Sequence, residues 1–212
     1  MPLSYQFSVP ANAAPGPYRL VTGVFDLIQQ DRILTAYGSY AVTATTFKIP
    51  LPPNTASPAQ TLSADFGDAI HFSGYTLESA EGGLSLTLFW QARAAPVADY
   101  TEFIHVVDAA GNIVAQSDSQ PLEGQYPTSI WSPGETIVER RVLQVPPGAY
   151  RVYVGLYGWE GEILDNLPVT LNGQRLPDVT DLKSMWKSDW VAFLIGSGIT
   201  FDGALERAGV PT

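Results

Sequence analysis

Leu84-Ser85-Leu86-Thr87-Leu88-Phe89-Trp90-Gln91 is the stretch of this sequence that decides the fold. Apolar side chains recur at every second position within it, at Leu84, Leu86, Leu88 and Trp90. A period of two places such side chains on one face of a β-strand, whereas a helix needs a period of about 3.6. The stretch therefore predicts a strand with one face in an apolar core.

The same alternation, bounded by Gly, Pro, Asn and Asp, continues on both sides of this strand. Residues 101–118 predict a hairpin, in which strands 101–108 and 113–116 flank the turn residues Ala109-Ala110-Gly111-Asn112. Residues 136–145 and 149–157 predict a second pair around Pro146-Pro147-Gly148. With further strands at 70–77 and 169–171, about seven or eight strands predict an all-β, antiparallel sandwich of the immunoglobulin-like or jelly-roll kind at residues 61–172.

The N-terminal part of the chain repeats one piece of this pattern. Pro15-Gly16-Pro17-Tyr18-Arg19-Leu20-Val21-Thr22-Gly23-Val24-Phe25 matches residues 147–157 at a constant offset of 132. We predict that residues 1–49 are a partial sandwich repeat, either the last strands of a preceding domain or strands docked on the second one. A proline-rich linker follows at residues 50–60, and residues 173–212 are a C-terminal extension to which the sequence assigns no role.

The composition excludes several classes of partner and chemistry. Eleven basic and 21 acidic residues give a net charge of -10, which repels phosphate backbones, so nucleic acid is not an expected partner. The absence of cysteine excludes disulfides, a thiolate nucleophile and cysteine-ligated metal. The N-terminal residues lack the pattern of a secretory signal, and the longest apolar stretch, residues 190–195, is far shorter than the roughly 20 residues of a membrane span. We expect no direct membrane insertion.

Several motifs together resemble a β-sandwich module of bacterial surface and membrane proteins. They are Phe66-Gly67-Asp68-Ala69-Ile70, Gly74-Tyr75-Thr76-Leu77, residues 86–92, residues 103–108, residues 126–135 and Pro147-Gly148-Ala149-Tyr150. The set is similar to the C-terminal soluble domains of polytopic dolichyl-phosphate-mannose mannosyltransferase-like glycosyltransferases. The resemblance implies an extracytoplasmic location in the cell envelope or at the surface, and a partner that is another protein or a neighbouring domain. It brings no catalytic residues.

The two histidines are the first candidates for chemistry. His105 shares a side of its strand with Phe103 and Val107, so it is either a proton carrier or a hydrogen-bonded structural histidine. We favour the structural role, because no orienting group and nucleophile lie nearby in the sequence. His71 points away from Ile70 and Phe72 in the pleat, and we expect it to be exposed.

Acidic pairs are the second candidates. Asp65 with Asp68, and Asp108 with Asp118, could each supply oxygen ligands to calcium. Neither pair has the dense Asp and Asn spacing of a calcium loop, and Asp68 and Asp108 stand beside turns, where Asp bonds its own backbone. We expect the turn role, and no metal or cofactor.

The best ligand candidate is the long connection from Ser119 to Glu135. Its aromatic side chains, with others placed near it by the hairpins, could form a platform for sugar rings; the predicted ligand residues are Trp131, Tyr126, Trp159, Tyr100 and Gln125. The alternative, which we favour, is that Trp131 plugs the open end of the sandwich.

The sequence therefore predicts a structural or interaction module with no catalytic centre. No Gly-x-Ser-x-Gly turn is present, and no glycine-rich phosphate loop precedes a helix. Two other functions stay open at this point: a carbohydrate-binding module that uses the loop aromatics, and a subunit that exchanges strands in a linear assembly.

Overall fold

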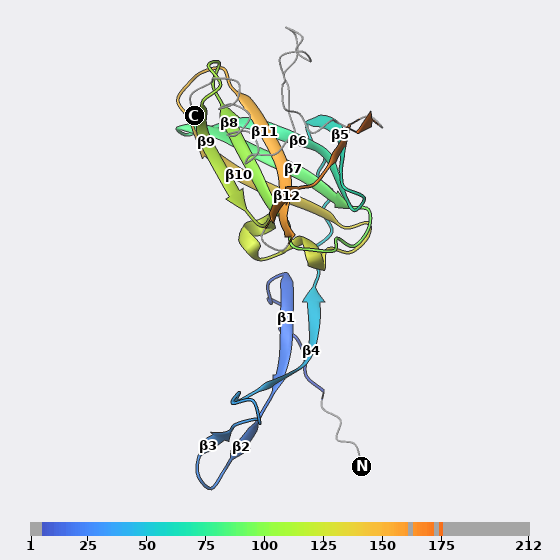
Figure 1. Cartoon of the computed structure of the whole chain (residues 1–212), viewed down its shortest axis with the longest axis vertical. Helices are drawn as coiled ribbons and strands as arrows, with labels where there is room; N and C mark the ends of the chain where they lie inside the picture. Colours follow the sequence, from blue (N-terminus) through green and yellow to red (C-terminus); the bar gives the residue numbers. More distant parts are fainter. Residues whose placement is uncertain (1–5, 161–162, 172–173, 176–212) are drawn as a thin grey trace. The chain divides into compact units, whose positions relative to one another are not determined.

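The computed structural model describes residues 6–160, 163–171 and 174–175, and divides the chain into two compact units, Met1–Pro52 and Pro53–Thr212. Each unit is built from strands (Figure 1). The described residues contain only two short 3-10 helices, and none of their helices is long and apolar enough to cross a bilayer.

Unit 1 is a two-stranded antiparallel ribbon in two segments. Strand β1 (Gly16–Thr22) pairs with β4 (Val42–Ile49), and β2 (Val24–Asp26) pairs with β3 (Asp31–Ile33). The rings of Tyr18 and Phe47 stack across β1 and β4 with centroids 5.6 Å apart. Within the described residues, this unit has no second layer of strands.

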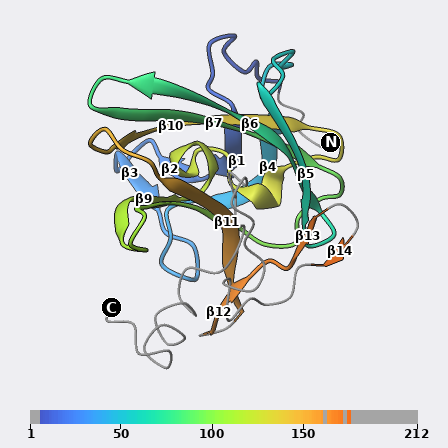
Figure 2. The same ribbon diagram turned by 90° about the horizontal axis from the view of Figure 1, so that it is seen from above.

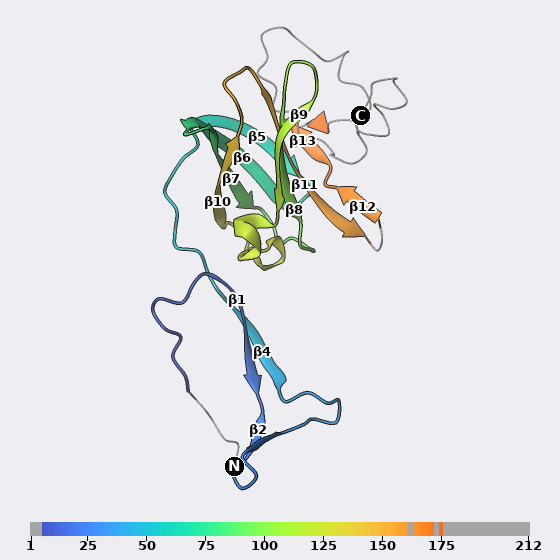
Figure 3. The same ribbon diagram turned by 90° about the vertical axis from the view of Figure 1, so that its left-hand side faces the viewer.

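Unit 2 is a sandwich of two antiparallel sheets, so the predicted all-β sandwich is confirmed (Figure 2). The first sheet has the order β10-β7-β6-β5-β13-β14 and the second β12-β11-β8-β9. Their bounds are β5 Gln60–Phe66, β6 Ile70–Ala80, β7 Gly83–Ala92, β8 Thr101–Val107, β9 Ile113–Ser119, β10 Thr136–Gln144, β11 Arg151–Glu160, β12 Ile163–Asn166, β13 Val169–Leu171 and β14 Gln174–Arg175. The helices η1 (Pro121–Gly124) and η2 (Thr128–Ile130) lie in the connection from β9 to β10 (Figure 3).

The core between the sheets follows from the alternation in β7. Leu86, Leu88 and Trp90 have no exposed surface, as expected for one buried face of that strand. The Trp90 ring contacts Phe66 on β5 and Phe72 on β6, at centroid distances of 5.2 and 4.8 Å. Burial of such aromatic and aliphatic surface is the main favourable contribution to folding.

The predicted hairpin at 101–118 is confirmed, because β8 pairs with β9 across the turn that begins at Asp108. The predicted pairing of 136–145 with 149–157 is wrong. Strand β10 pairs with β7 and β11 pairs with β8, so Pro146-Pro147-Gly148 carries the chain from one sheet to the other. Two prolines supply no N–H donors and hold their φ angles, which disfavours a tight hairpin turn.

Candidate functional site

A cluster of charged side chains lies between the two sheets. Glu102 on β8 and Glu139 on β10 are each 1% exposed, and both approach Arg141 on β10. The indole N–H of Trp90 donates to Glu102 Oε2 at 2.7 Å, and Arg141 forms an ion pair with Glu139 Oε1. The backbone N–H of Leu122 in η1 also donates to Glu139 Oε1, at 3.0 Å. The cluster thus ties both sheets and the η1 turn together.

One guanidinium group serves two carboxyl groups in this cluster. The pKa of Glu102 is raised to about 8, first by burial and then by the nearby Glu139, while Arg141 and the Trp90 hydrogen bond act in the opposite direction. Burial raises the pKa of Glu139 too, and its direct contacts with Arg141 oppose that shift. At neutral pH, Glu102 is therefore the protonated member, and Glu139 forms the ion pair. Because both carboxyl groups are closed off from solvent, the cluster holds the layers together and does not reach a substrate.

A second cluster, accessible from solvent, joins Asp65 on β5, His71 on β6 and Arg93 just after β7. Asp65 and His71 are direct cross-strand partners, with Nδ1 of His71 2.6 Å from Oδ1 of Asp65. Arg93 Nη1 donates to Asp65 Oδ2 at 2.8 Å, and Nη2 lies 2.9 Å from His71 Nδ1. The prediction that His71 is exposed is wrong: its side chain is only 12% exposed, because Asp65 and Arg93 cover it.

This second cluster has the parts needed for proton transfer. When Nδ1 of His71 donates to Asp65, Nε2 carries the free lone pair, and no partner for it occurs among the described residues. A carboxylate that orients a histidine in this way is the usual support of a general acid or base. The Arg93 side chain is 49% exposed and has N–H groups beyond the two used here, which suit a ligand carboxylate.

The other polar candidates have structural partners. Nε2 of His105 lies 3.7 Å from Oδ1 of Asp118, and its ring packs 5.0 Å from that of Phe103. Asp108 accepts hydrogen bonds from the backbone N–H groups of Ala110 and Asn112, at 2.8 and 2.9 Å, which is the turn role. Within the part of the chain that the structure describes, no three His, Cys, Asp or Glu side chains group around a possible metal.

The loop aromatics fill the interior. Tyr126 is fully buried and Trp131 is 2% exposed, and the Trp131 indole donates to the Tyr126 carbonyl at 3.0 Å. Tyr100 is half-buried beside Thr128, Gln125 is exposed, and the Trp159 side chain lies outside the described part. The rings of Tyr126 and Trp131, which were expected to stack on a sugar, are therefore unavailable to a ligand. Burying their apolar surface in the core stabilises the fold more than leaving it exposed to water.

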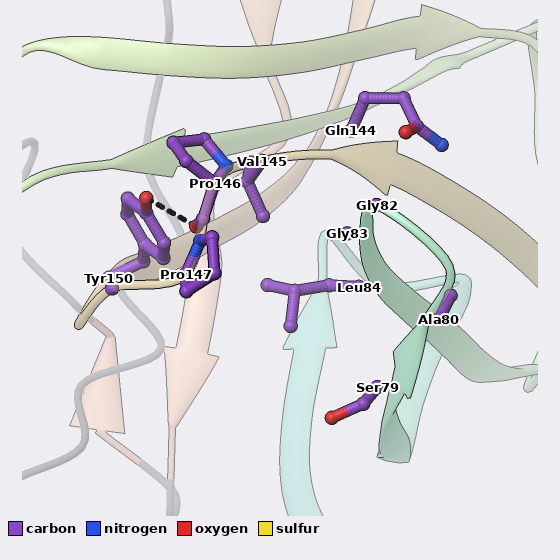
Figure 4. Close-up of a pocket in the computed structure, with 11 residues that line it drawn as sticks. Ser79, Ala80, Gly82, Gly83, Leu84, Gln144, Val145, Pro146, Pro147 and Tyr150 are labelled. Atoms are coloured by element: carbon purple, nitrogen blue, oxygen red, sulfur yellow. Dashed lines mark hydrogen bonds between the residues drawn. The ribbon is translucent and has the colours of Figure 1, made fainter.

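The groove in Figure 4 lies between the β6–β7 turn and the connection from β10 to β11. It encloses about 690 Å³ and is lined by Leu84, Gln144, Tyr150 and their neighbours, none of them charged. The Tyr150 hydroxyl donates to the Pro146 carbonyl at 2.7 Å and braces one wall. The groove supplies shape but no acid or base, so the Asp65–His71–Arg93 cluster is the better candidate for chemistry.

Comparison with known proteins finds short partial matches to proteins that share one name. Three bacterial proteins named "Putative hydro-lyase" match parts of the chain: from Saccharopolyspora erythraea, 39% identical over 54 residues; from Oceanobacillus iheyensis, 41% over 54 residues; and from Streptomyces avermitilis, 48% over 40 residues. The matches cover 24%, 24% and 19% of this chain, and 21%, 21% and 15% of those proteins. The chain thus spans about a fifth or less of the length of these relatives. No family model matches, and no solved structure matches.

These matches contradict the prediction of a module that is not an enzyme. Five proteins with the hydro-lyase name share short segments with the chain, at 39% to 48% identity. The carbohydrate-binding and strand-exchange alternatives are set aside with that prediction. The resemblance to mannosyltransferase-associated domains and the extracytoplasmic location stay predictions.

Proposed function

We propose that this chain is part of a hydro-lyase, and that Asp65, His71 and Arg93 form its acid–base site. The observation that carries the proposal is the 2.6 Å contact between His71 and Asp65, with Arg93 bound to the same carboxylate. The hydro-lyase name of the matched proteins supports the reaction class. A hydro-lyase removes water from its substrate and leaves a carbon–carbon double bond.

His71 can carry the proton through the whole reaction. Its Nε2 lone pair takes a proton from a substrate carbon, and the electron pair of that C–H bond forms the double bond. The neighbouring C–O bond breaks, and the protonated imidazole returns the same proton to the departing hydroxyl group, which leaves as water. Asp65 stabilises the transient imidazolium by its charge and its hydrogen bond.

Arg93 indicates the substrate class. A carboxylate next to the reacting carbon makes its C–H bond more acidic, and a guanidinium group binds a carboxylate through paired N–H donors. Because the chain as a whole has a net charge of -10, an anionic substrate needs such a local positive group. We therefore propose a small hydroxycarboxylic acid as the substrate.

The test uses the full chain with malate, tartrate and citrate as probes. Ultraviolet absorbance reports the conjugated alkene, and proton NMR in heavy water reports exchange at the substrate carbon. We expect turnover of at least one acid, a loss of about 100-fold or more in His71→Gln, and a raised KM in Arg93→Lys.

The matched control is His105→Gln, which changes the other histidine and should keep full activity. If none of the three acids shows either turnover or exchange, the proposal is overturned. Equal activity of the His71→Gln variant and the unchanged chain would overturn the assigned site.

A further inference from the structure

A row of polar side chains crosses the outer face of the first sheet. Its members are direct cross-strand partners on five neighbouring strands, so each lies opposite the next. We call them the polar row: Thr170 on β13, Asp65 on β5, His71 on β6, Gln91 on β7 and Thr136 on β10. All five are half-buried, while their neighbours along the strands, such as Phe66, Ile70 and Trp90, face the core. The polar row therefore extends the Asp65–His71 pair in both directions across the sheet.

His71 stands between two members of the polar row, because β6 lies between β5 and β7. On one side, Oδ1 of Asp65 lies 2.6 Å from Nδ1 of the ring. On the other side, Gln91 lies directly opposite His71, and facing Cβ atoms in such a pair are about 5 Å apart. A small molecule bound at Nε2 of His71 is therefore within reach of the Gln91 side chain.

Arg93 shares the outer face of the sheet with Gln91. One residue separates them, so in an extended chain their side chains lie on the same side. The bond from Arg93 Nη1 to Asp65 Oδ2, at 2.8 Å, places Arg93 on that side, because Asp65 belongs to the polar row. Two residues of extended chain span about 6.6 Å, a distance that one small ligand can bridge between two side chains. One molecule can therefore contact the guanidinium group and the Gln91 amide together.

The Gln91 amide is free to bind a ligand. Neither it nor the hydroxyl group of Thr136, its partner on β10, has a hydrogen-bond partner among the described residues. A primary amide offers two N–H donors and a carbonyl acceptor, so it can both donate to a hydroxyl group and accept from it. The guanidinium group of Arg93 suits a carboxylate instead. The two side chains thus suit two different groups of one hydroxycarboxylic acid.

The same amide suits the reaction as well as the binding. As the C–O bond of the substrate breaks, the departing oxygen gains negative charge until the His71 imidazolium returns its proton. An N–H donor at this oxygen stabilises the charge, and the effect is larger in a partly buried site than in water. Gln91 supplies such a donor beside the histidine.

We propose that Gln91 binds the hydroxyl group that leaves the substrate, and that it selects hydroxycarboxylic acids over the same acids without the hydroxyl group. The carboxylate then lies on Arg93 and the reacting C–H bond at Nε2 of His71. Thr170, at the far end of the polar row beyond Asp65, takes no part. The inference rests on the proposed function, because it concerns the same site.

The test is a titration of the full chain, followed by proton–nitrogen NMR, with hydroxypivalate and pivalate as probes. The two acids differ by one hydroxyl group, and neither has a C–H bond on the carbon next to its carboxylate, so neither can lose water. We expect the dissociation constant to be about five- to tenfold lower for hydroxypivalate, and the two constants to become equal in Gln91→Leu. Thr170→Val is the matched control, because it removes a hydroxyl group from the same row and should keep the preference.

A second measurement needs no variant. The side-chain amide resonance of Gln91 should shift with hydroxypivalate and much less with pivalate. The role of Gln91 is overturned if that resonance does not move, if the unchanged chain binds neither acid or both equally, or if the preference survives in Gln91→Leu. The lyase proposal fails separately, by the absence of turnover and exchange with malate, tartrate and citrate. Circular dichroism of both variants checks that they are folded.

Discussion

The indole nitrogen of Trp90 donates a 2.7 Å hydrogen bond to Oε2 of Glu102, and this bond connects the two sheets of the sandwich. Trp90 has no exposed surface and Glu102 is 1% exposed. The other carboxyl oxygen of Glu102, Oε1, has no hydrogen-bond partner within the described residues and lies 3.9 Å from Nε of Arg141. A buried carboxyl group held in this way makes stability depend on pH.

We expect the sandwich to lose stability as the pH rises. The folded state raises the pKa of Glu102 from 4.5 to about 8, mainly by burial, so between those values the folded state keeps a proton that the unfolded chain releases. The stability that this retained proton contributes is complete below pH 4.5 and is lost as the pH approaches about 8. Urea unfolding should show a free energy lower by about 1 to 3 kcal/mol at about pH 8 than at about pH 6.

The variant Glu102→Gln is the control for this pH effect, since an amide keeps the acceptor for Trp90 but does not titrate. Its free energy of unfolding should vary much less over the same range. An unchanged slope would show that another group causes the dependence.

Trp90→Phe should destabilise the sandwich by about 1 to 3 kcal/mol. Phenylalanine keeps most of the aromatic packing against Phe66 and Phe72 but removes the N–H donor, which leaves Oε2 of Glu102 buried without its partner. Urea denaturation measures the loss. Combining the change with Glu102→Gln gives the coupling between the two side chains, and strictly additive effects would contradict the bond's role.

Gly155→Ala tests the close packing of β11 on β8. A Cβ atom at Gly155 would lie 2.2 Å from Cζ of Phe103, which is only 2% exposed. We expect a loss of about 1 to 3 kcal/mol in thermal or urea unfolding. Adding Phe103→Leu should recover part of the lost stability. If it recovers none, the clash with Phe103 is not the cause of the loss.

Trp131→Ala separates packing from ligand binding in the loop before β10. Trp131 is 2% exposed and bonds the Tyr126 carbonyl, so its truncation should leave a cavity and cost about 3 to 5 kcal/mol of unfolding free energy. Differential scanning calorimetry measures the change. A variant as stable as the unchanged chain would show that the ring is not part of the core.

Tyr150→Phe and Tyr18→Phe form a matched pair of changes in the two units. Each removes one hydroxyl that donates to a carbonyl four residues earlier, and each should cost about 0.5 to 1 kcal/mol. Hydrogen exchange should report the first loss in β10 and β11, and the second in β1 and β4. A loss that spread equally over both units would contradict the assignment of each hydrogen bond to its own unit.

Much of the fold could be predicted from the sequence because strand alternation is local. The strands predicted at 84–91 and 101–108 correspond to β7 and β8, and the tight turn after Asp108 marks β9 as the hairpin partner of β8. The pairing predicted for β10 and β11 was wrong, because adjacency in sequence does not choose a partner across two sheets. Strand β5, at Gln60–Phe66, was not predicted as a separate strand.

The candidate site could not be predicted in the same way. Asp65, His71 and Arg93 lie on three segments, and only the register of β5, β6 and β7 brings them together. One signal was present, since Asp65 and His71 flank the short turn at residues 67–69, but the strand before that turn was not predicted. Nothing local to Arg93 marks it as their third member.

By itself the sequence determined that this chain is built from strands with a buried apolar face, because a period of two in side-chain polarity is a property of a few successive residues. Tertiary structure alone decided which strands pair, which carboxyl groups are buried against Arg141, and which histidine meets a carboxylate. These relationships depend on registers between segments far apart in the chain, and a shift of one residue would turn every such side chain to the opposite face.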